Sequence, residues 1–176
     1  MPRRSHPARI LAAGLALAAG SGHATGLVQP EVVVADASLA PAQRAAMELA
    51  ARRYGSFWDT GDEALALQAL APDFVDMTPP PGREQGPRGA LLASRAFRAA
   101  VPDLRCEVEQ MIVAGDRVVV HLHFRGHFTG SFQDIRGRGQ AIDFVATDIY
   151  RIEDGRIAAN WHIEDNLALM RQLGAL

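Results

Sequence analysis

The 176-residue sequence predicts an α+β domain in which helices come first and an antiparallel sheet follows. Apolar residues recur at helical spacing as far as residue 100, and from residue 105 onward they alternate with polar residues. Turn signals at Gly115-Asp116 and Asp154-Gly155 join the alternating segments into two hairpins. A chain of this length forms one domain with a substantial core.

Composition and charge exclude several classes of protein. Hydrophobic residues make up 48% of the chain and charged residues 22%, which excludes a disordered or fibrous protein. The formal net charge of −2 argues against a nucleic-acid-binding protein, which is normally basic. Cys106 is the single cysteine, so an intramolecular disulfide and a multi-cysteine metal site are both excluded.

The first 24 residues have the three-part pattern of a secretory signal peptide. Arg3, Arg4 and Arg9 precede an apolar run over residues 10–19. The small residues Gly22 and Ala24 then stand at the two positions that a signal peptidase recognises. The run is too short to span a bilayer as a helix, and the alternative is an uncleaved N-terminal anchor. We therefore expect a bacterial protein that is periplasmic or secreted and is not membrane-bound after cleavage.

The helical half is predicted element by element. Residues 25–40 show no strong period and are expected to be a tether with a short strand at 32–34, ahead of a domain over 41–176. Pro41 suits the first turn of a helix over 41–58, and Asp62 can cap a second helix that ends before Pro72. A short extended piece at 73–77 leads into a proline- and glycine-rich loop over 78–89. A third helix follows over 89–100.

The second half is predicted to be four strands and a closing helix. The strands cover residues 105–114, 117–128, 140–152 and 156–163, with a polar loop at 132–139 and a short helix at 166–173.

Polar side chains alternate with apolar ones on three of these strands. They are His121 and His123 on the first, Asp148 and Tyr150 on the second, and Asn160, His162 and Glu164 on the third. Each strand can therefore place ionisable groups on one face of the sheet. The simplest alternative is that this polar face meets solvent.

The register of the last hairpin decides whether an acid meets an imidazole. If the turn sets Ile152 opposite Ala158, Asp148 faces His162, and directly opposed side chains lie about 5 Å apart. A shift of one residue puts Asp148 opposite Trp161 instead and removes the pair. We favour the first register, in which Asp148 can hold the His162 tautomer or share a proton with it. Proton abstraction next to a carbonyl needs a base of this kind, with its pKa raised by burial.

Four segments together resemble a known family. They are Gly-His-Phe-Thr-Gly at 126–130, Ile-Glu-Asp-Gly-Arg-Ile at 152–157, Asn-Trp-His-Ile-Glu-Asp at 160–165 and Gln-Leu-Gly at 172–174. Over residues 42–174 the chain resembles the SnoaL-like polyketide cyclases of the nuclear transport factor 2 superfamily. The resemblance implies a cone-shaped barrel in which a curved antiparallel sheet and three helices enclose a pocket, and homodimers that pack through the sheet. It also implies an aldol-type ring closure by an acid/base aspartate without a metal or cofactor.

The resemblance leaves several residues as candidates for this chemistry. Asp148, His162 and Asp165 are the candidate catalytic residues, although Asp165 could instead cap the last helix. The expected pocket residues are His121, His123, Glu164, Asn160, Tyr150, Trp161, Trp58, Tyr54 and Asp76. Tyr54 has a second interpretation as an oxyanion donor, and Trp161 is expected to be core or pocket wall.

A metal site is the alternative use of His121, His123 and His127. The acidic residue that usually follows such a histidine pair is missing, so we expect no metal and no cofactor. The predicted function is acid/base chemistry on a small carbonyl compound or ester, as in an aldol-type cyclase, isomerase or hydrolase. The alternatives are a periplasmic protein that binds a small ligand unchanged, and a dimer-forming adaptor whose pocket is filled by side chains.

Overall fold

A computed structural model describes residues 26–176 and shows four helices and eight strands in this part of the chain. The predicted signal peptide lies outside the described residues. The elements in order are β1 Val32–Ala35, α1 Pro41–Thr60, α2 Glu63–Ala69, β2 Leu70–Asp76, α3 Pro87–Ala100, β3 Arg105–Ala114, β4 Arg117–Phe128, β5 Ser131–Phe132, β6 Ile135–Arg136, β7 Gln140–Glu153, β8 Arg156–Glu164 and α4 Asn166–Leu173.

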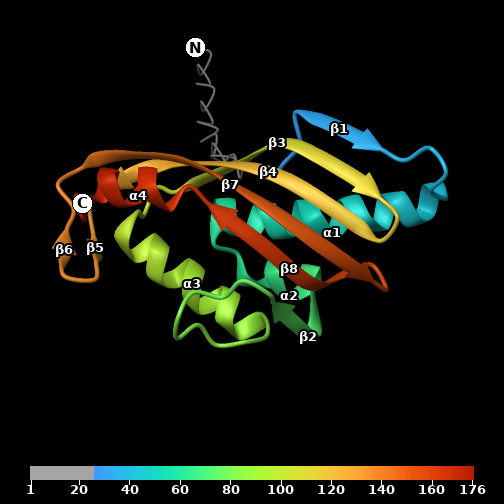
Figure 1. Ribbon diagram of the computed structural model, residues 1–176, viewed down its shortest axis with the longest axis horizontal. Helices are drawn as coiled ribbons and strands as arrows, with labels where there is room; N and C mark the ends of the chain where they lie inside the picture. The colour runs from blue at the N-terminus through green and yellow to red at the C-terminus, as the bar shows by residue number, and fades with distance from the viewer. Residues whose placement is uncertain (1–25) are drawn as a thin grey trace, which may run out of the picture.

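Six strands form one curved sheet in the order β1-β3-β4-β7-β8-β2, with α1, α2 and α3 against one of its faces (Figure 1). The predicted α+β class is confirmed, and the four predicted strands form the antiparallel centre of the sheet. The two edge strands differ from the expected all-antiparallel pattern, because β1 pairs with β3 and β2 pairs with β8 in parallel. One or more helices lie between each edge strand and its partner along the chain. A connection of this length lets the chain cross over and pair in parallel.

Residues 26–40 are held against the domain and do not form a free tether. The predicted short strand is present as β1, whose backbone pairs with residues 110–113 of β3. The Val28 N–H donates to Ser56 Oγ of α1 at 2.8 Å, which fixes the segment on its other side.

Local signals explain where the helices begin and end. Pro41 opens α1, and Gly61 ends it in the left-handed conformation that favours glycine. The Asp62 side chain caps α2 as predicted, accepting the Ala64 N–H at 3.0 Å. α3 starts at Pro87, two residues before the predicted start at Gly89, because proline is well suited to the first helical turn. The polar loop at 132–139 contains the small β5–β6 hairpin.

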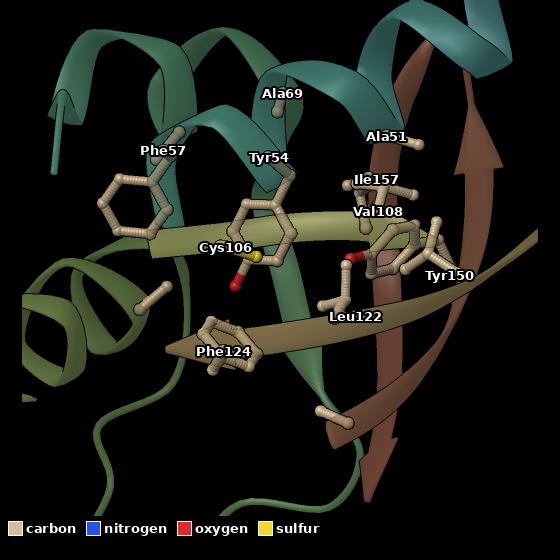
Figure 2. Packing of buried hydrophobic residues seen from close by; sticks show 14 of the residues in the cluster. Ala51, Tyr54, Phe57, Ala69, Cys106, Val108, Leu122, Phe124, Tyr150 and Ile157 are labelled. Carbon is tan, nitrogen blue, oxygen red and sulfur yellow. The ribbon is translucent and has the colours of Figure 1, made fainter. Parts of the chain in front are cut away.

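The core lies between α1 and the inner, concave face of the sheet. Tyr54 and Phe57 of α1 descend onto this face beside Cys106, Leu122 and Tyr150 (Figure 2). Aromatic rings form a continuous series through the core, with Tyr54 edge-on to Tyr150 at 5.7 Å between centroids. Among the helices of residues 26–176, none is both long and apolar enough to cross a membrane.

Candidate active site

A cavity of about 450 Å³ opens between the inner face of the sheet, helices α1, α3 and α4, and the loop that follows β2. One part of its wall is apolar and is formed by Trp58, Phe74, Ala90, Ala93, Ala96, Phe97, Phe124, Phe132, Phe144, Ala146, Leu169 and Met170. The other part is polar and carries Asp76, Arg83, Glu84, Asp148, Asn160, His162 and Glu164. A pocket of this size and composition suits a small molecule with an apolar body and a polar end.

The β7–β8 register brings the polar residues together. Asp148 pairs with His162 and Tyr150 with Asn160, so the favoured register is confirmed at these positions. Nearer the turn, Ile152 pairs with Ile157 and not with Ala158. The register shifts there, because Ala158 is an extra residue of β8 that has no partner on β7. The inward row of β8 therefore faces the same cavity as the inward row of β7.

Asp148 is the most deeply buried carboxyl of the polar wall, with 5% of its surface exposed. Its Oδ2 accepts hydrogen bonds from the Tyr150 hydroxyl and the Asn160 amide, both at 3.1 Å. Burial raises the pKa of Asp148 to about 6, against the opposing effects of the His162 charge and of these two hydrogen bonds. Because Oδ2 already accepts both bonds, Oδ1 is the oxygen left to exchange a proton.

His162 is held by two carboxylates, and Asp148 is neither of them. Its Nε2 lies 3.0 Å from Asp76 Oδ1 and its Nδ1 lies 2.6 Å from Glu164 Oε1. The expectation that Asp148 fixes the His162 tautomer is therefore wrong. Burial acts to lower the pKa of His162, but the hydrogen bond to Glu164 and the surrounding carboxylate charges outweigh it and raise that pKa. With a carboxylate at each ring nitrogen, the ring protonated on both nitrogens satisfies both contacts, and its charge acts to lower the pKa of Asp148.

Glu164 and the loop after β2 complete the polar wall. Burial acts to raise the pKa of Glu164, but the hydrogen bond to His162 and the charge of that ring lower it below its usual value. Asp76 ends β2 opposite Asn160 of β8. The Gln85 amide bonds to both the N–H and the carbonyl of Asp76, each at 2.9 Å. Arg83 extends from the same loop to within 3.5 Å of Asp76.

Thr78 fastens the start of this loop to β8. Its hydroxyl accepts the backbone N–H of His162 at 2.9 Å and donates to the backbone carbonyl of His162 at 3.0 Å. The roles of Arg83 and Gln85 were missed from the sequence, since a proline-rich loop has no period that indicates which side chains turn inward.

His121, His123 and Trp161 do not line this cavity, contrary to expectation. They have the opposite strand parity to Asp148 and His162, so they lie on the outer, convex face of the sheet. His121 bonds to Thr147 there, and Arg117 lies 5.7 Å from the Trp161 ring centroid. The sequence shows the alternation on each strand, but only the pairing between strands shows which rows share a face.

Three other predicted positions also need correction or placement. Asp165 is exposed and caps α4 by accepting the Ala168 N–H at 2.9 Å, so it is not a pocket acid. Tyr150 lies behind Asp148 and not on the cavity wall. His127 lies at the surface and bonds to Asp103. Within residues 26–176, no group of three or more His, Cys, Asp or Glu side chains is arranged to hold a metal ion.

Tyr54, Trp58, Asp76, Asn160, His162 and Glu164 line the cavity as expected. The aromatic part of the wall was not singled out from the sequence. Phe124 and Phe144 stack with 5.1 Å between centroids, and Phe97 packs edge-on to Phe144 at 6.0 Å. The alternation of the strands could have predicted this position, because Phe124 alternates in step with Leu122 and Phe144 with Asp148. All four side chains therefore point to the same face of the sheet.

The family of the chain follows from comparison with known proteins. The model of the SnoaL-like polyketide cyclases matches residues 48–173, most of the sequence. The chain belongs to this SnoaL-like family. It is 39% identical to a protein of Bacillus cereus ATCC 10987 named as a candidate polyketide cyclase, with a TM-score of 0.77 over 86% of this chain and 96% of that one.

Two Streptomyces proteins are also similar to this SnoaL-like chain. TsrD from Streptomyces laurentii is 32% identical, with a TM-score of 0.69 over 76% of this chain and 98% of that one. IdmH from Streptomyces antibioticus, named as a candidate polyketide cyclase, is 26% identical, with a TM-score of 0.64 over 71% and 96%. No curated protein matches the sequence. The fold is thus that of small-molecule cyclases and isomerases.

Proposed function

We propose that this protein is an enzyme that moves a proton next to a carbonyl group of a small, largely apolar ketone or ester. The observation that carries the proposal is the position of Asp148, a carboxyl on the wall of an apolar cavity with a pKa of about 6. A base of this strength is ionised at neutral pH and still returns a proton readily. Aldol-type cyclisation, isomerisation and ester cleavage through an enolate all begin with such a step.

Asp148 Oδ1 takes the proton from the carbon beside the carbonyl, and the electron pair of the C–H bond becomes the enolate. The proton then returns from Asp148 to carbon or oxygen of the product. A positive charge on His162 stabilises the ionised form of Asp148, because it opposes the effect of burial on that carboxyl. Asp76 and Glu164 keep that charge in place by accepting both ring N–H groups.

The apolar wall favours a flat substrate. The stacked Phe124 and Phe144 rings, with Phe97 edge-on to Phe144, present aromatic surfaces against which a planar body can pack. Ala90, Ala93 and Ala96 of α3 add small side chains to this wall and leave space for such a body.

Deuterium exchange tests the proposal without knowledge of the product. Aryl β-keto esters are incubated with the protein in D₂O, and loss of the proton signal beside the carbonyl is followed by NMR. The wild-type protein is expected to accelerate exchange over buffer, and Asp148→Asn to abolish the acceleration. Asp143→Asn is the matched control, because Asp143 lies on β7 but on the outer face.

Two results contradict the proposal. The first is exchange by the wild-type protein at the buffer rate while the esters bind, which identifies a protein that binds its ligand unchanged. The second is full exchange activity in folded Asp148→Asn, which assigns the base elsewhere.

The proposal includes a homodimer that forms through the outer face. Apolar side chains are exposed there and along the adjoining edge strand, namely Val32, Val34, Ile112, Ile149 and Ile163. Ile163→Arg is expected to convert a dimer into a monomer in sedimentation velocity, and a wild-type monomer contradicts this part of the proposal.

Secretion is the last part of the proposal. It is supported by the arginines and the apolar run within residues 1–24. Mass spectrometry of the protein recovered from a periplasmic extract of its host is expected to find a mature N-terminus near residue 25. Recovery of the full-length chain from the cytoplasm contradicts it.

A further inference from the structure

Tyr54 carries a hydroxyl that the rest of the protein does not use. It lies on α1, 3% exposed, and its ring descends toward the sheet with the hydroxyl on the side of Phe124 (Figure 2). The same residue lines the cavity described above. A buried hydroxyl normally finds a hydrogen-bond partner, so its surroundings indicate what it can bind.

The hydrogen of this hydroxyl has no acceptor among residues 26–176. The Trp58 side chain packs edge-on to Tyr54 at 6.2 Å between centroids. An indole N–H can only donate, so Trp58 offers no acceptor to the Tyr54 hydroxyl. Tyr54 therefore presents a donor to the cavity.

Tyr150 gives an internal comparison. The two rings pack against each other, yet the Tyr150 hydroxyl donates to Asp148 Oδ2 at 3.1 Å. One tyrosine therefore orients the carboxyl, and the other keeps its donor for a molecule in the cavity.

Tyr54 remains neutral across the working pH range. Burial raises the pKa of the phenol, and the nearby charge of Asp148 raises it further. Tyr54 and Asp148 both line the cavity, so one small molecule can contact both side chains.

Two other donors of the polar wall, His162 and Asn160, already donate to its carboxylates. His162 directs both N–H groups to Asp76 and Glu164, and the Asn160 amide donates to Asp148. Arg83 is drawn toward Asp76 in the loop after β2. Arg83 keeps further N–H groups but has 25% of its side chain exposed, so Tyr54 is the buried donor that can meet an oxygen while Asp148 meets the neighbouring carbon.

We propose that Tyr54 is the carbonyl-binding catalytic residue, whose O–H donates to the substrate carbonyl oxygen. When Asp148 removes the proton beside the carbonyl, the electron pair moves through the carbon–carbon bond to that oxygen. The Tyr54 hydrogen bond stabilises the resulting enolate, and no proton leaves Tyr54. This inference rests on the proposed function for its chemical step, but the binding contact can be tested separately.

The test uses 2-acetylnaphthalene with a ¹³C-labelled carbonyl, in a series of aryl methyl ketones of one to three rings. Isotope-edited infrared difference spectra record the carbonyl band of the bound ketone. In the wild-type protein the band is expected at lower wavenumber than in Tyr54→Phe, because a donated hydrogen bond weakens the C=O bond. Tyr54→Phe is also expected to weaken binding about tenfold, the effect of losing one hydrogen bond. Asp143→Asn, on the outer face of the sheet, is the control and keeps the wild-type band.

A second measurement observes Tyr54 itself and does not depend on the phenylalanine variant folding. The chain has two tyrosines, so 3-fluorotyrosine incorporated into Tyr150→Phe labels Tyr54 alone. Its ¹⁹F resonance is expected to shift when the ketone binds.

The inference is overturned if no ketone of the series binds, if the carbonyl band is the same in wild type and Tyr54→Phe, or if the fluorine resonance does not move. Its catalytic part is overturned if Tyr54→Phe exchanges deuterium at the wild-type rate. Failure of the proposed function looks different, because the carbonyl band then shifts normally while the wild-type protein shows no exchange.

Discussion

His162 and His123 are held in the same way on opposite faces of one sheet. His162 lies between Asp76 at 3.0 Å and Glu164 at 2.6 Å, and His123 lies between Glu109 at 2.9 Å and Asp143 at 2.6 Å. The pKa of each histidine is raised. For His162 the hydrogen bond to Glu164 and the surrounding carboxylate charges together outweigh burial, and for His123 the hydrogen bond to Asp143 is the largest cause. As a list of residue types and distances, the two clusters are nearly equivalent.

Enclosure is what separates the two clusters. The inner one faces a cavity closed by helices and has Asp148 beside it, whereas Asp143 of the outer one keeps 60% of its side chain exposed. The hydrogen bond to His123 is the main reason that the pKa of Asp143 is lowered. Solvent screens the charges of this outer cluster. A histidine between two acids therefore does not identify an active site unless a dry cavity adjoins it.

The largest expected effect tests this difference directly. Asp148→Asn is expected to reduce deuterium exchange by about 10²- to 10⁴-fold, the usual contribution of a positioned acid/base group. Asp143→Asn is expected to stay within about twofold of wild type, since it changes only the outer cluster. Equal losses in both variants would contradict the distinction between the faces.

The second prediction concerns stability against pH. The folded pKa of Asp148, about 6, lies above the unfolded value of about 3.9, so its contribution to stability is present below pH 4 and is lost as pH rises through 6. Asp148→Asn cannot lose a proton and keeps an acceptor for Tyr150 and Asn160. Between pH 4 and pH 8 its free energy of unfolding is therefore expected to gain up to about 3 kcal/mol relative to wild type. Urea titrations at both pH values measure this, and parallel pH dependence of the two proteins would contradict it.

The third prediction compares the histidines. His162→Gln is expected to lower the free energy of unfolding by about 2 kcal/mol, because it leaves two enclosed carboxylates without a cation between them. His123→Gln is expected to lower it by about 0.5 kcal/mol or less, since solvent reaches the outer carboxylates. The His162 effect is expected to be largest below pH 6.5 and to shrink as pH rises through its raised pKa. Thermal melts at pH 6 and pH 9 check the order, and similar losses for both variants contradict it.

The smallest effect is expected from Tyr150→Phe, which removes one of the two hydrogen bonds to Asp148 Oδ2. Loss of a donor to the carboxylate raises the pKa of Asp148 further, by up to about one unit. The midpoint of the pH–rate profile for deuterium exchange is expected to move upward accordingly. An unchanged or lower midpoint shows that Tyr150 does not stabilise the ionised carboxyl.

Much of the fold could be predicted from periodicity and turn chemistry, because these are local properties. The strands 105–114 and 117–128 and the helix 166–173 agree with the structure at both ends, and Asp62 caps α2 as expected. The favoured β7–β8 register followed from the Asp-Gly turn and correctly paired Asp148 with His162. The parallel pairing of the two edge strands was missed, because pairing between distant segments leaves no local pattern.

The sequence by itself determined the alternating rows of acids and histidines, the turns that join them and the family to which the chain belongs. Only the tertiary structure decided which row is enclosed, that Asp76 and Glu164 hold His162, and that Asp165 serves as a cap. The physical reason is that a carboxyl acquires a raised pKa from its separation from water. That separation is produced by helices and a loop packing over one face of the sheet, and it cannot be read from the strand alone.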